Sequence, residues 1–361
     1  MKPELNKAVS PVLPEAIFLK YKPKTVNKNS DMSQAVEWLM EGKYVLLEDE
    51  YSTGLNLLSE LKKRVFSKTM KENFKKYRSQ RSVHHFTSNN LLTTVSNGEV
   101  DLEKAPEIGW LELFYPESSE IYLSFPQIQG LNSSWQWYIN GIQYPVLSDK
   151  IHPYYGVYFP TRFDHLLLFE SWIKQQKGKF ESAMDIGAGC GVLSFQMLKH
   201  GIKSVVASDI NPNAIISVQK DIERMGLESS KLITVQSDLF EGIDGKSDLI
   251  VFNPPWLPAQ KEEEGLDQAI YYESDLFDRF FSEAVDHLND NGRIVILFSN
   301  LALVEGYSAE HPVISELALN NRFKKVELIK RKSAQKSKKT KRRDNRKNEY
   351  IELWELRRSP D

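Results

Sequence analysis

The chain has 361 residues, of which 41% are hydrophobic, and its formal net charge is −2. This length exceeds a usual single-domain core, so we expect two domains. The single cysteine, Cys190, excludes an intramolecular disulfide framework and a multi-cysteine metal site, and we expect no metal. Because the sequence has no long apolar run and no secretory signal at its N-terminus, we expect a cytoplasmic protein without a membrane span.

The N-terminal part of the chain predicts an α+β domain. Residues 55–77 begin with an apolar stripe that is typical of a helix. Residues 110–125 and 135–146 contain many aromatic and β-branched side chains, which favour β structure. The dipeptide Asn140-Gly141 lies inside the second stretch and is typical of a type I′ turn. We therefore expect a β-hairpin there.

A buried strand and a glycine-rich turn are predicted near the middle of the chain. Residues 182–186 read as a strand, and residues 192–198 resume with the apolar spacing of a helix. Between them, Gly187, Gly189 and Gly191 allow a tight turn and let the backbone approach a ligand without a Cβ atom in the way. A strand, a glycine turn and a helix in this order form the nucleotide-binding half of a doubly wound fold.

The following strand, residues 204–209, ends in an acid that fits nucleoside binding. Asp209 lies about 20 residues beyond the turn, where a ribose-binding carboxylate is expected. A carboxylate there can accept hydrogen bonds from both ribose hydroxyls. The turn lacks the third glycine of the dinucleotide fingerprint, so a nucleoside without phosphates fits better than a dinucleotide. S-adenosylmethionine is such a ligand, and an incidental glycine turn in another α/β protein is the alternative.

A strand predicted at residues 248–253 ends in the tetrapeptide Asn253-Pro254-Pro255-Trp256. An amide or an exocyclic amine is a poor nucleophile because its lone pair is conjugated. The Asn253 side-chain oxygen and the Pro254 carbonyl can accept hydrogen bonds from such an NH2 group and free its lone pair. The prolines stiffen the loop, and Trp256 offers a flat face for stacking. The tetrapeptide predicts methyl transfer to a planar nitrogen, whereas an ordinary strand-ending turn is the alternative.

Positive charge is concentrated near the C-terminus. The segment Lys330–Lys347 contains eleven Lys or Arg against one acid, Asp344, while the rest of the chain carries about −12. The segment separates two strand-like stretches, residues 323–329 and 350–356, so we expect a long loop with few apolar residues. Nucleic acid or the ribosome is the partner that this charge favours. A solvated loop without a partner is the alternative.

The predicted architecture is α/β, with a Rossmann-like seven-stranded sheet preceded by the α+β domain. We expect the α+β domain to span residues 1–150 and to recognise the substrate. The catalytic domain is expected to span residues 151–361. The strands are expected near residues 181–186, 204–209, 232–236, 248–253, 293–299, 323–329 and 350–356. The last strand is inserted antiparallel. In such a sheet the ligand binds at the carboxyl ends of the first strands, and Asn253 brings the reacting nitrogen to it.

Together these motifs make residues 150 to about 330 resemble the class I S-adenosylmethionine-dependent methyltransferases of the N-P-P-[YFW] group. The HemK-like protein-glutamine methyltransferases and the small methyltransferase domain set are the most similar subgroup. Those proteins carry a β-hairpin and a V-x-x-P-R-P-E-T-E-like segment before the glycine motif. Residues 156–165 share the hydrophobicity, the Pro and the Arg of that segment but not its acids. After Trp256, residues 257–265 replace the usual E-P-x-x-A-L stretch, so the resemblance indicates the chemistry better than the substrate.

The resemblance implies roles for further residues. Thr161 and Arg162 would border the methionine end of the cofactor, and Asp238 would face the adenine amine. The expected catalytic residues are Asn253, Pro254, Pro255 and Trp256. The expected residues of the S-adenosylmethionine site are Thr161, Arg162, Asp185, Gly187, Ala188, Gly189, Gly191, Asp209, Ile210, Asp238, Leu239 and Asn253.

Three functions are compatible with these motifs. The favoured one is methylation of an exocyclic base amine in RNA or DNA, with the Lys330–Lys347 segment contacting nucleic acid. The second is methylation of a glutamine side-chain amide in a translation protein. The third is a catalytically silent scaffold, against which the intact glycine turn, Asp209 and Asn253 argue. RNA, DNA and protein acceptors share the same active-site chemistry, so the acceptor remains open at this point.

Overall fold

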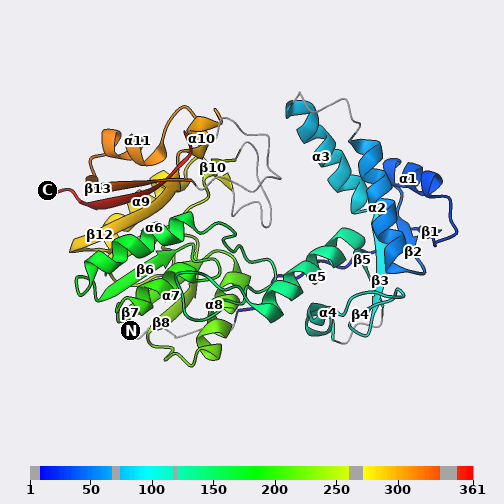
Figure 1. The fold of residues 1–361 in the computed structure, drawn as a ribbon, viewed down its shortest axis with the longest axis horizontal. Helices are drawn as coiled ribbons and strands as arrows, with labels where there is room; N and C mark the ends of the chain where they lie inside the picture. Colours follow the sequence, from blue (N-terminus) through cyan, green and yellow to red (C-terminus); the bar gives the residue numbers. More distant parts are fainter. Residues whose placement is uncertain (1–8, 67–73, 117–119, 260–270, 334–347, 361) are drawn as a thin grey trace. The chain divides into compact units, whose positions relative to one another are not determined.

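The structure, a computed structural model, describes residues 9–66, 74–116, 120–259, 271–333 and 348–360 (Figure 1). The chain divides into two compact units. The N-terminal unit comprises Leu13–Ile139, and the C-terminal unit comprises Met1–Val12 and Asn140–Asp361. Within the described ranges, no helix is both long enough and apolar enough to span a membrane.

The described residues of the N-terminal unit form a mixed sheet and five helices, which confirms the predicted α+β character. The strands β1, β2 and β3 run parallel, and β4 and β5 pair antiparallel with β3. The strands are β1 Lys24–Val26, β2 Val45–Leu47, β3 Leu91–Ser96, β4 Glu99–Val100 and β5 Ile121–Ser124. The helices are α1 Met32–Met40, α2 Tyr51–Val65, α3 Phe74–Ser88, α4 Gly109–Phe114 and α5 Phe125–Asn140.

The hairpin predicted around Asn140-Gly141 is wrong, because α5 occupies its first half. The aromatic side chains that favour a strand instead pack at helical spacing: Trp135 and Tyr138 lie 5.7 Å apart between ring centroids. Both rings also contact Trp110, at 5.1 and 4.5 Å. Gly141 follows the helix with φ of 65°, a conformation that glycine commonly adopts just after a helix.

Two other expectations for this unit need correction. Residues 110–125 were expected to be β structure, but α4 occupies the first part and only β5 is a strand. The helix expected over residues 55–77 is divided between α2 and the start of α3, and residues 67–73 lie outside the described ranges. The apolar stripe itself is present in α2, where Leu57 and Leu61 are fully buried.

The C-terminal unit is built on a seven-stranded sheet, as predicted. The strand order is β13-β14-β12-β9-β6-β7-β8, and β14 runs antiparallel to both of its neighbours. The strands are β6 Ser182–Ile186, β7 Ser204–Asp209, β8 Leu232–Gln236, β9 Ser247–Phe252, β12 Leu288–Ser299, β13 Phe323–Lys332 and β14 Tyr350–Arg358. A small parallel pair, β10 Leu257–Pro258 and β11 Tyr271–Tyr272, follows the Asn253–Trp256 loop.

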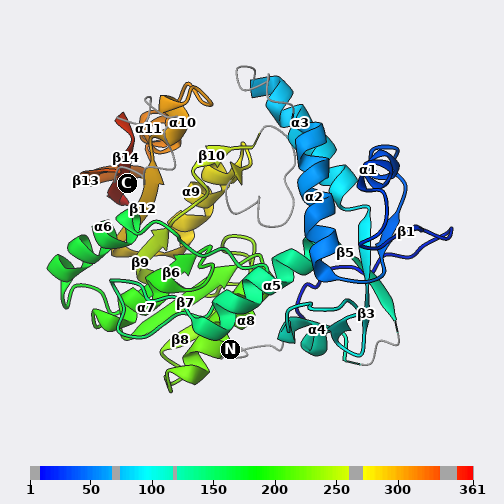
Figure 2. The same cartoon turned by 45° about the vertical axis from the view of Figure 1, so that its right-hand side comes forward.

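Helices cover both faces of this sheet (Figures 1 and 2). They are α6 Asp164–Ile173, α7 Val192–Lys199, α8 Pro212–Arg224, α9 Leu276–His287, α10 Leu301–Val304 and α11 Pro312–Leu319, with a 3-10 turn η1 Lys174–Gln176. Adjacent strand residues point to opposite faces. Asp185 bonds to Ser194 of α7 on one face, whereas Met184 and Ile186 join the cluster that contains Phe280 of α9 on the other.

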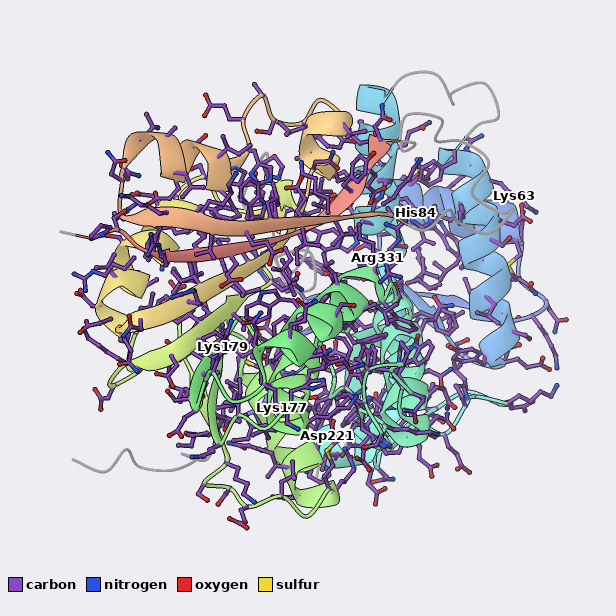
Figure 3. The ribbon with its side chains drawn as sticks, turned by 60° about the vertical axis from the view of Figure 1, so that its left-hand side comes forward. Lys63, His84, Lys177, Lys179, Asp221 and Arg331 are labelled. Atoms are coloured by element: carbon purple, nitrogen blue, oxygen red, sulfur yellow. The ribbon has the colours of Figure 1, made fainter. Side chains whose placement is uncertain are left out.

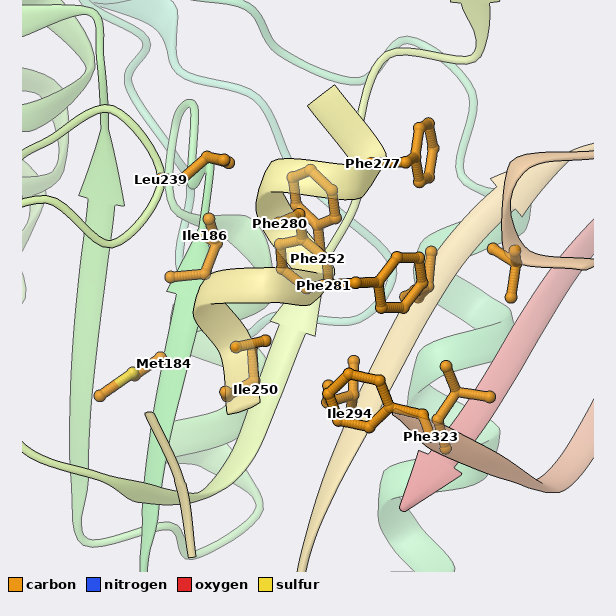
Figure 4. Close-up of a cluster of buried hydrophobic side chains, with 14 of the residues drawn as sticks. Met184, Ile186, Leu239, Ile250, Phe252, Phe277, Phe280, Phe281, Ile294 and Phe323 are labelled. Carbon is orange, nitrogen blue, oxygen red and sulfur yellow. The ribbon is translucent and has the colours of Figure 1, made fainter. Parts of the chain in front are cut away.

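A cluster of buried aromatic side chains fixes the end of β9 (Figure 4). The rings of Phe252 and Phe280 stack with centroids 4.1 Å apart and an interplanar angle of 14°. Phe277 meets the Phe252 ring nearly edge-on at 6.2 Å. Since Phe252 is the last residue of β9, this packing also holds Asn253, the next residue, in place.

The basic segment begins inside a strand rather than in a loop. Lys330, Arg331 and Lys332 form the end of β13, which is the edge strand of the sheet; Arg331 is labelled in Figure 3. The expected loop therefore starts later than predicted. Residues 334–347 lie outside the described ranges.

Glu170 of α6 ties this helix to α7. One carboxylate oxygen lies 2.8 Å from His200 Nε2 and 3.1 Å from Gln196 Nε2, and the other lies 3.1 and 3.2 Å from the ammonium groups of Lys174 and Lys199. Burial by itself would raise the pKa of Glu170, but these hydrogen bonds hold the pKa down at about 2. The ionised carboxylate is therefore a stabilising contact between two helices that flank the glycine turn.

We expect Glu170→Gln to lower the free energy of unfolding by about 2 kcal/mol at pH 7, because it removes the charge from a largely buried ion-pair cluster. Since the folded-state pKa lies below the ordinary value of 4.5, the stabilisation is present above pH 4.5 and is lost as pH falls through about 2. Urea unfolding of both proteins between pH 7 and pH 2 measures the difference. Glu228→Gln, which alters an exposed pair with Lys231, is the matched control. A pH-independent difference would contradict the assignment.

Candidate active site

The glycine turn leaves β6 beside the ends of its two neighbours. Ile186 pairs with Phe252 of β9 on one side and with Ser208 of β7 on the other. The next residue of each strand, Gly187, Asn253 and Asp209, therefore emerges at the same edge of the sheet. These three residues come from segments predicted to bind the cofactor or the acceptor.

The turn is shaped to leave room on its open side. Gly187 and Gly189 adopt φ of 70° and 54°, in the left-handed region that favours glycine. A Cβ atom on Gly187 would meet no atom within 4 Å, whereas one on Gly189 would lie 3.2 Å from the Tyr158 carbonyl oxygen. The backbone of Tyr158 therefore packs against the turn at Gly189, whereas the space next to Gly187 is open.

Asp209 is held in place by backbone donors. Its Oδ2 accepts the N–H of Gly189 and its Oδ1 accepts the N–H of Asn211, both at 2.8 Å. Burial raises the pKa of Asp209 from its usual value, although these hydrogen bonds oppose the shift. An ionised carboxylate has about four acceptor sites, so each oxygen retains capacity for a ribose hydroxyl. The side chain of the next residue, Ile210, is 61% exposed and offers an apolar surface beside the acid.

Asp185 carries an unsatisfied acceptor beneath the turn. Ser194 donates its hydroxyl to Asp185 Oδ2, whereas Oδ1 is buried without a hydrogen-bond partner. Burial raises the pKa of Asp185 to about 7. A buried acceptor without a partner is costly, and the ammonium group of an amino-acid ligand is a suitable partner. The orphaned oxygen and the space beside Gly187 thus fit the methionine part of S-adenosylmethionine.

The segment that precedes α6 lies along the same side of the unit. Asn211, two residues beyond Asp209, donates its side-chain amide to the Gly156 carbonyl at 2.9 Å. Asp221 of α8, labelled in Figure 3, accepts the backbone N–H of His152 at 2.9 Å. These bonds fix residues 152–156 along α8, from its last turn at Asp221 to its N-cap at Asn211.

Other predicted cofactor residues are already paired with protein groups. Asp238 forms an ion pair with Arg279 of α9. Arg162 donates to Glu349, just before β14, at 3.0 Å, and Thr161 is exposed. Leu239 is buried with φ of 50°. The contacts in the structure thus link Gly189 and Asp209 directly, whereas Arg162 is paired with the residue that precedes β14.

The acceptor loop presents one unsatisfied oxygen. Asn253 Oδ1 is buried and has no hydrogen-bond partner. Pro254 is buried, and Pro255 and Trp256 are half-buried. Neither proline has an N–H to compete for this oxygen. The loop therefore holds an acceptor that is ready to receive an N–H group from a ligand.

His165, to which no sequence motif gives a role, contacts this loop. His165 is the second residue of α6 and is 3% exposed. Its ring meets that of Trp256 at 88°, with centroids 5.6 Å apart. The sequence offers no signal for this contact, because a lone histidine in an apolar helix resembles a core residue.

The single cysteine lies in the turn but is not suited to act as a nucleophile. Cys190 is 2% exposed, and burial raises the pKa of its thiol to about 12, so the thiol is protonated at neutral pH. In the described ranges, no group of three or more His, Cys, Asp or Glu side chains is placed to hold a metal ion.

A polar cavity of about 510 Å³ lies elsewhere in the unit. Its lining includes Lys179, Lys246 and Asp248, which precede or begin β6 and β9. Asn253 and Gly187 follow the carboxyl ends of the same strands, so the cavity is at the opposite edge of the sheet and is not part of this site.

The C-terminal unit is similar in sequence to known methyltransferases. Residues 150–336 match the family model described as "Methyltransferase small domain". A Methanocaldococcus jannaschii protein assigned as a protein N5-glutamine methyltransferase is 35% identical over 164 residues, which cover 42% of this chain and 76% of that protein. In structure, the ribosomal protein L11 methylase of Lactobacillus delbrueckii aligns with a TM-score of 0.40 and 19% identity, over 60% of this chain and 91% of its own.

Two further relatives are named by their substrates. The release factor glutamine methyltransferase of Lactococcus lactis is 30% identical over 125 residues, or 31% of this chain and 45% of that protein. The ribosomal protein uL3 glutamine methyltransferase of Neisseria meningitidis is 33% identical over 111 residues, or 30% of this chain and 36% of that protein. The chain thus spans less than half the length of these two relatives.

We expect Asp209→Ala to weaken S-adenosylmethionine binding by roughly 1.5–3 kcal/mol, the usual cost of losing hydrogen bonds to a charged group. Isothermal titration calorimetry measures the affinity, and circular dichroism checks that the variant is folded. Asp290→Ala, an exposed acid at the opposite edge of the sheet, is the control and should bind normally. NADH should not bind the wild type. Unchanged affinity in folded Asp209→Ala protein would contradict the ribose assignment.

Proposed function

Because the chain belongs to the methyltransferase small domain family and is an S-adenosylmethionine-dependent methyltransferase, we propose that its acceptor is a glutamine side-chain amide in a translation protein. From the sequence motifs alone, an exocyclic base amine of RNA or DNA is the favoured acceptor and the amide is second. The relatives named for release factor and for ribosomal protein uL3 support the amide instead. They also argue against a silent scaffold.

The partnerless Asn253 Oδ1 supports an acceptor with an NH2 group, a property that a base amine shares, and the named relatives favour the amide. A buried acceptor without a hydrogen bond costs roughly 1–3 kcal/mol, so a native protein retains one only where something offsets it. The NH2 group of a primary amide supplies the missing donor. The Pro254 carbonyl, next in the chain, can accept the second N–H and thereby turn the nitrogen lone pair out of conjugation.

The loop orients the amide and leaves its reactive side free. The fixed φ of Pro254 and Pro255 limits motion of the carbonyl, and the Trp256 ring offers a face on which the planar amide stacks. When bound, S-adenosylmethionine supplies an electrophilic methyl group on a sulfonium. Catalysis by this chain then consists of alignment and of stabilising the charge that develops on nitrogen through Asn253 and Pro254.

The residues at the ends of β6 and β7 are suited to hold the cofactor. We assign Asp209 to the ribose hydroxyls, Asp185 to the methionine ammonium and Ile210 to the adenine ring. Asp238 can reach the adenine amine only if it shares its carboxylate with Arg279, with which it is paired. Because β6 lies between β7 and β9, a cofactor held by Asp209 and Asp185 would be next to the loop that begins at Asn253.

We assign substrate recognition to residues 1–150 and catalysis to residues 151–361. As a ribosomal protein, uL3 is part of the ribosome, whose RNA is a polyanion. The eleven basic residues of Lys330–Lys347 suit contact with such a surface, as charge complementarity guides association. In this proposal the basic segment guides the enzyme to its protein substrate and is not the site where RNA is modified.

Methyl-labelled S-adenosylmethionine tests the acceptor. The wild type is incubated separately with a purified release factor, with ribosomal protein uL3 and with total RNA from the source organism. We expect label in one of the two proteins, released as N5-methylglutamine after enzymatic digestion. Label in RNA alone would overturn the amide proposal and restore the base-amine alternative.

We expect Asn253→Ala to reduce turnover by roughly 100-fold or more, as removal of a preorganised polar contact typically does. Its affinity for S-adenosylmethionine should stay near that of the wild type, because Asn253 acts on the acceptor. Steady-state kinetics and calorimetry separate the two effects. Asn291→Ala, which removes an exposed amide at the opposite edge of the sheet, is the matched control. Full activity of Asn253→Ala would refute the planar-nitrogen mechanism.

A further inference from the structure

His165 is a buried imidazole to which the structure gives no hydrogen bond. The side chain is 3% exposed, and both Nδ1 and Nε2 are buried without a partner. Burial lowers its pKa to about 4, so the ring is neutral at pH 7 and carries one N–H donor and one acceptor nitrogen. His311 is buried to a similar degree, but its Nε2 lies 3.0 Å from Glu352. His165 thus differs from an ordinary core histidine.

The position of His165 connects it to the acceptor loop. Its ring contacts Trp256, the residue that follows the two prolines. The segment just before α6 is anchored on both sides: the Tyr144 hydroxyl donates to the Pro160 carbonyl at 3.2 Å, and Arg162 pairs with buried Glu349. His165 therefore follows a segment that is held by long-range contacts. Its ring contacts Trp256, which we assign to stacking on the acceptor.

A primary amide needs a donor as well as acceptors. Its NH2 group matches Asn253 Oδ1 and a backbone carbonyl, but its carbonyl oxygen requires an N–H or O–H group. In the described part of the C-terminal unit, the buried side chains with a partnerless donor-capable atom are His165, His311, Ser333 and Ser359. His311 contacts Phe298 and Trp354, and Ser359 lies beyond the end of β14 at the opposite edge. Ser333 follows β13, which is three positions from β9 in the strand order. His165 is the one in contact with Trp256.

We propose that His165 is an acceptor-binding residue whose ring N–H donates to the carbonyl oxygen of the glutamine amide. Both nitrogens are shielded from solvent in the structure described here, so side chains around the imidazole must move before it meets the acceptor. The bound amide would then satisfy the orphaned groups of His165 and Asn253 together. This inference rests on the proposed glutamine-amide acceptor.

Two substitutions at His165 separate hydrogen bonding from packing. Phenylalanine keeps a ring against Trp256 but has no donor, whereas glutamine keeps an N–H donor of similar reach. With the protein that the wild type labels, release factor or uL3, we expect His165→Phe to lower kcat/KM for the protein acceptor roughly tenfold, the effect of one lost hydrogen bond. His165→Gln should recover part of this loss. The dissociation constant for S-adenosylmethionine should change less than about twofold in both variants, since the cofactor contacts are intact.

A structural role would give different readouts. Because phenylalanine removes partnerless polar atoms from a buried site, His165→Phe should unfold at the same temperature as the wild type or higher. Wild-type kcat/KM in His165→Phe would overturn the proposal. Equal losses in the Phe and Gln variants would overturn it too, because packing would then be the cause. If the wild type labels no glutamine, both the acceptor assignment and this inference fall; if His165→Phe labels glutamine as well as the wild type does, only this inference falls.

Discussion

The site depends on the register of three parallel strands, β7, β6 and β9, whose carboxyl ends lie next to one another. Pairing of Ile186 with Phe252 and with Ser208 sets β6, β9 and β7 in one register, and the following residues emerge side by side. A one-residue slip of β9 would turn Phe252 out of the aromatic cluster and carry Asn253 away from the turn. Stacking of Phe252 on Phe280 opposes that slip, so the hydrophobic core maintains the spacing on which methyl transfer depends.

Three buried groups without a hydrogen bond belong to the proposed site. We assign Asp185 Oδ1 to the cofactor, and Asn253 Oδ1 and the His165 ring to the acceptor. Other partnerless atoms of the same unit, such as His311 Nδ1 and Ser359 Oγ, lie outside the proposed site. The buried carboxylates of Glu170 and Glu352, in contrast, have several partners each. Folding stability favours satisfied groups, so the partnerless atoms of the proposed site are those that a bound ligand could satisfy.

The central strands β6 and β9 could be predicted from sequence because they are short apolar runs that are buried on both faces. Such runs are typical of the parallel strands in an α/β sheet. The hairpin predicted from Asn140-Gly141 is wrong because this dipeptide is compatible with two different structures. A glycine with positive φ closes a tight hairpin, but it follows a helix equally well, and here packing of Trp135 and Tyr138 on Trp110 decides for the helix. That packing joins residues distant in sequence, which no local pattern reveals.

In the candidate site, too, the residues that depend on local sequence could be predicted, whereas those that depend on long-range contacts could not. Gly187, Asp209 and Asn253 could be found from sequence because each follows directly from a strand whose position was predictable. The partners of Arg162 and Asp238 could not, since the ion pairs with Glu349 and Arg279 span 187 and 41 residues. His165 required the structure for a further reason.

His165 stands out because its buried ring has no hydrogen-bond partner in the structure. No sequence pattern predicts that a side chain will lack a partner. Reaction chemistry in this fold is thus encoded locally at strand ends, whereas the features that would select an amide acceptor arise from long-range packing. Relatives can therefore share the Asn-Pro-Pro loop and still differ in the molecule that they methylate.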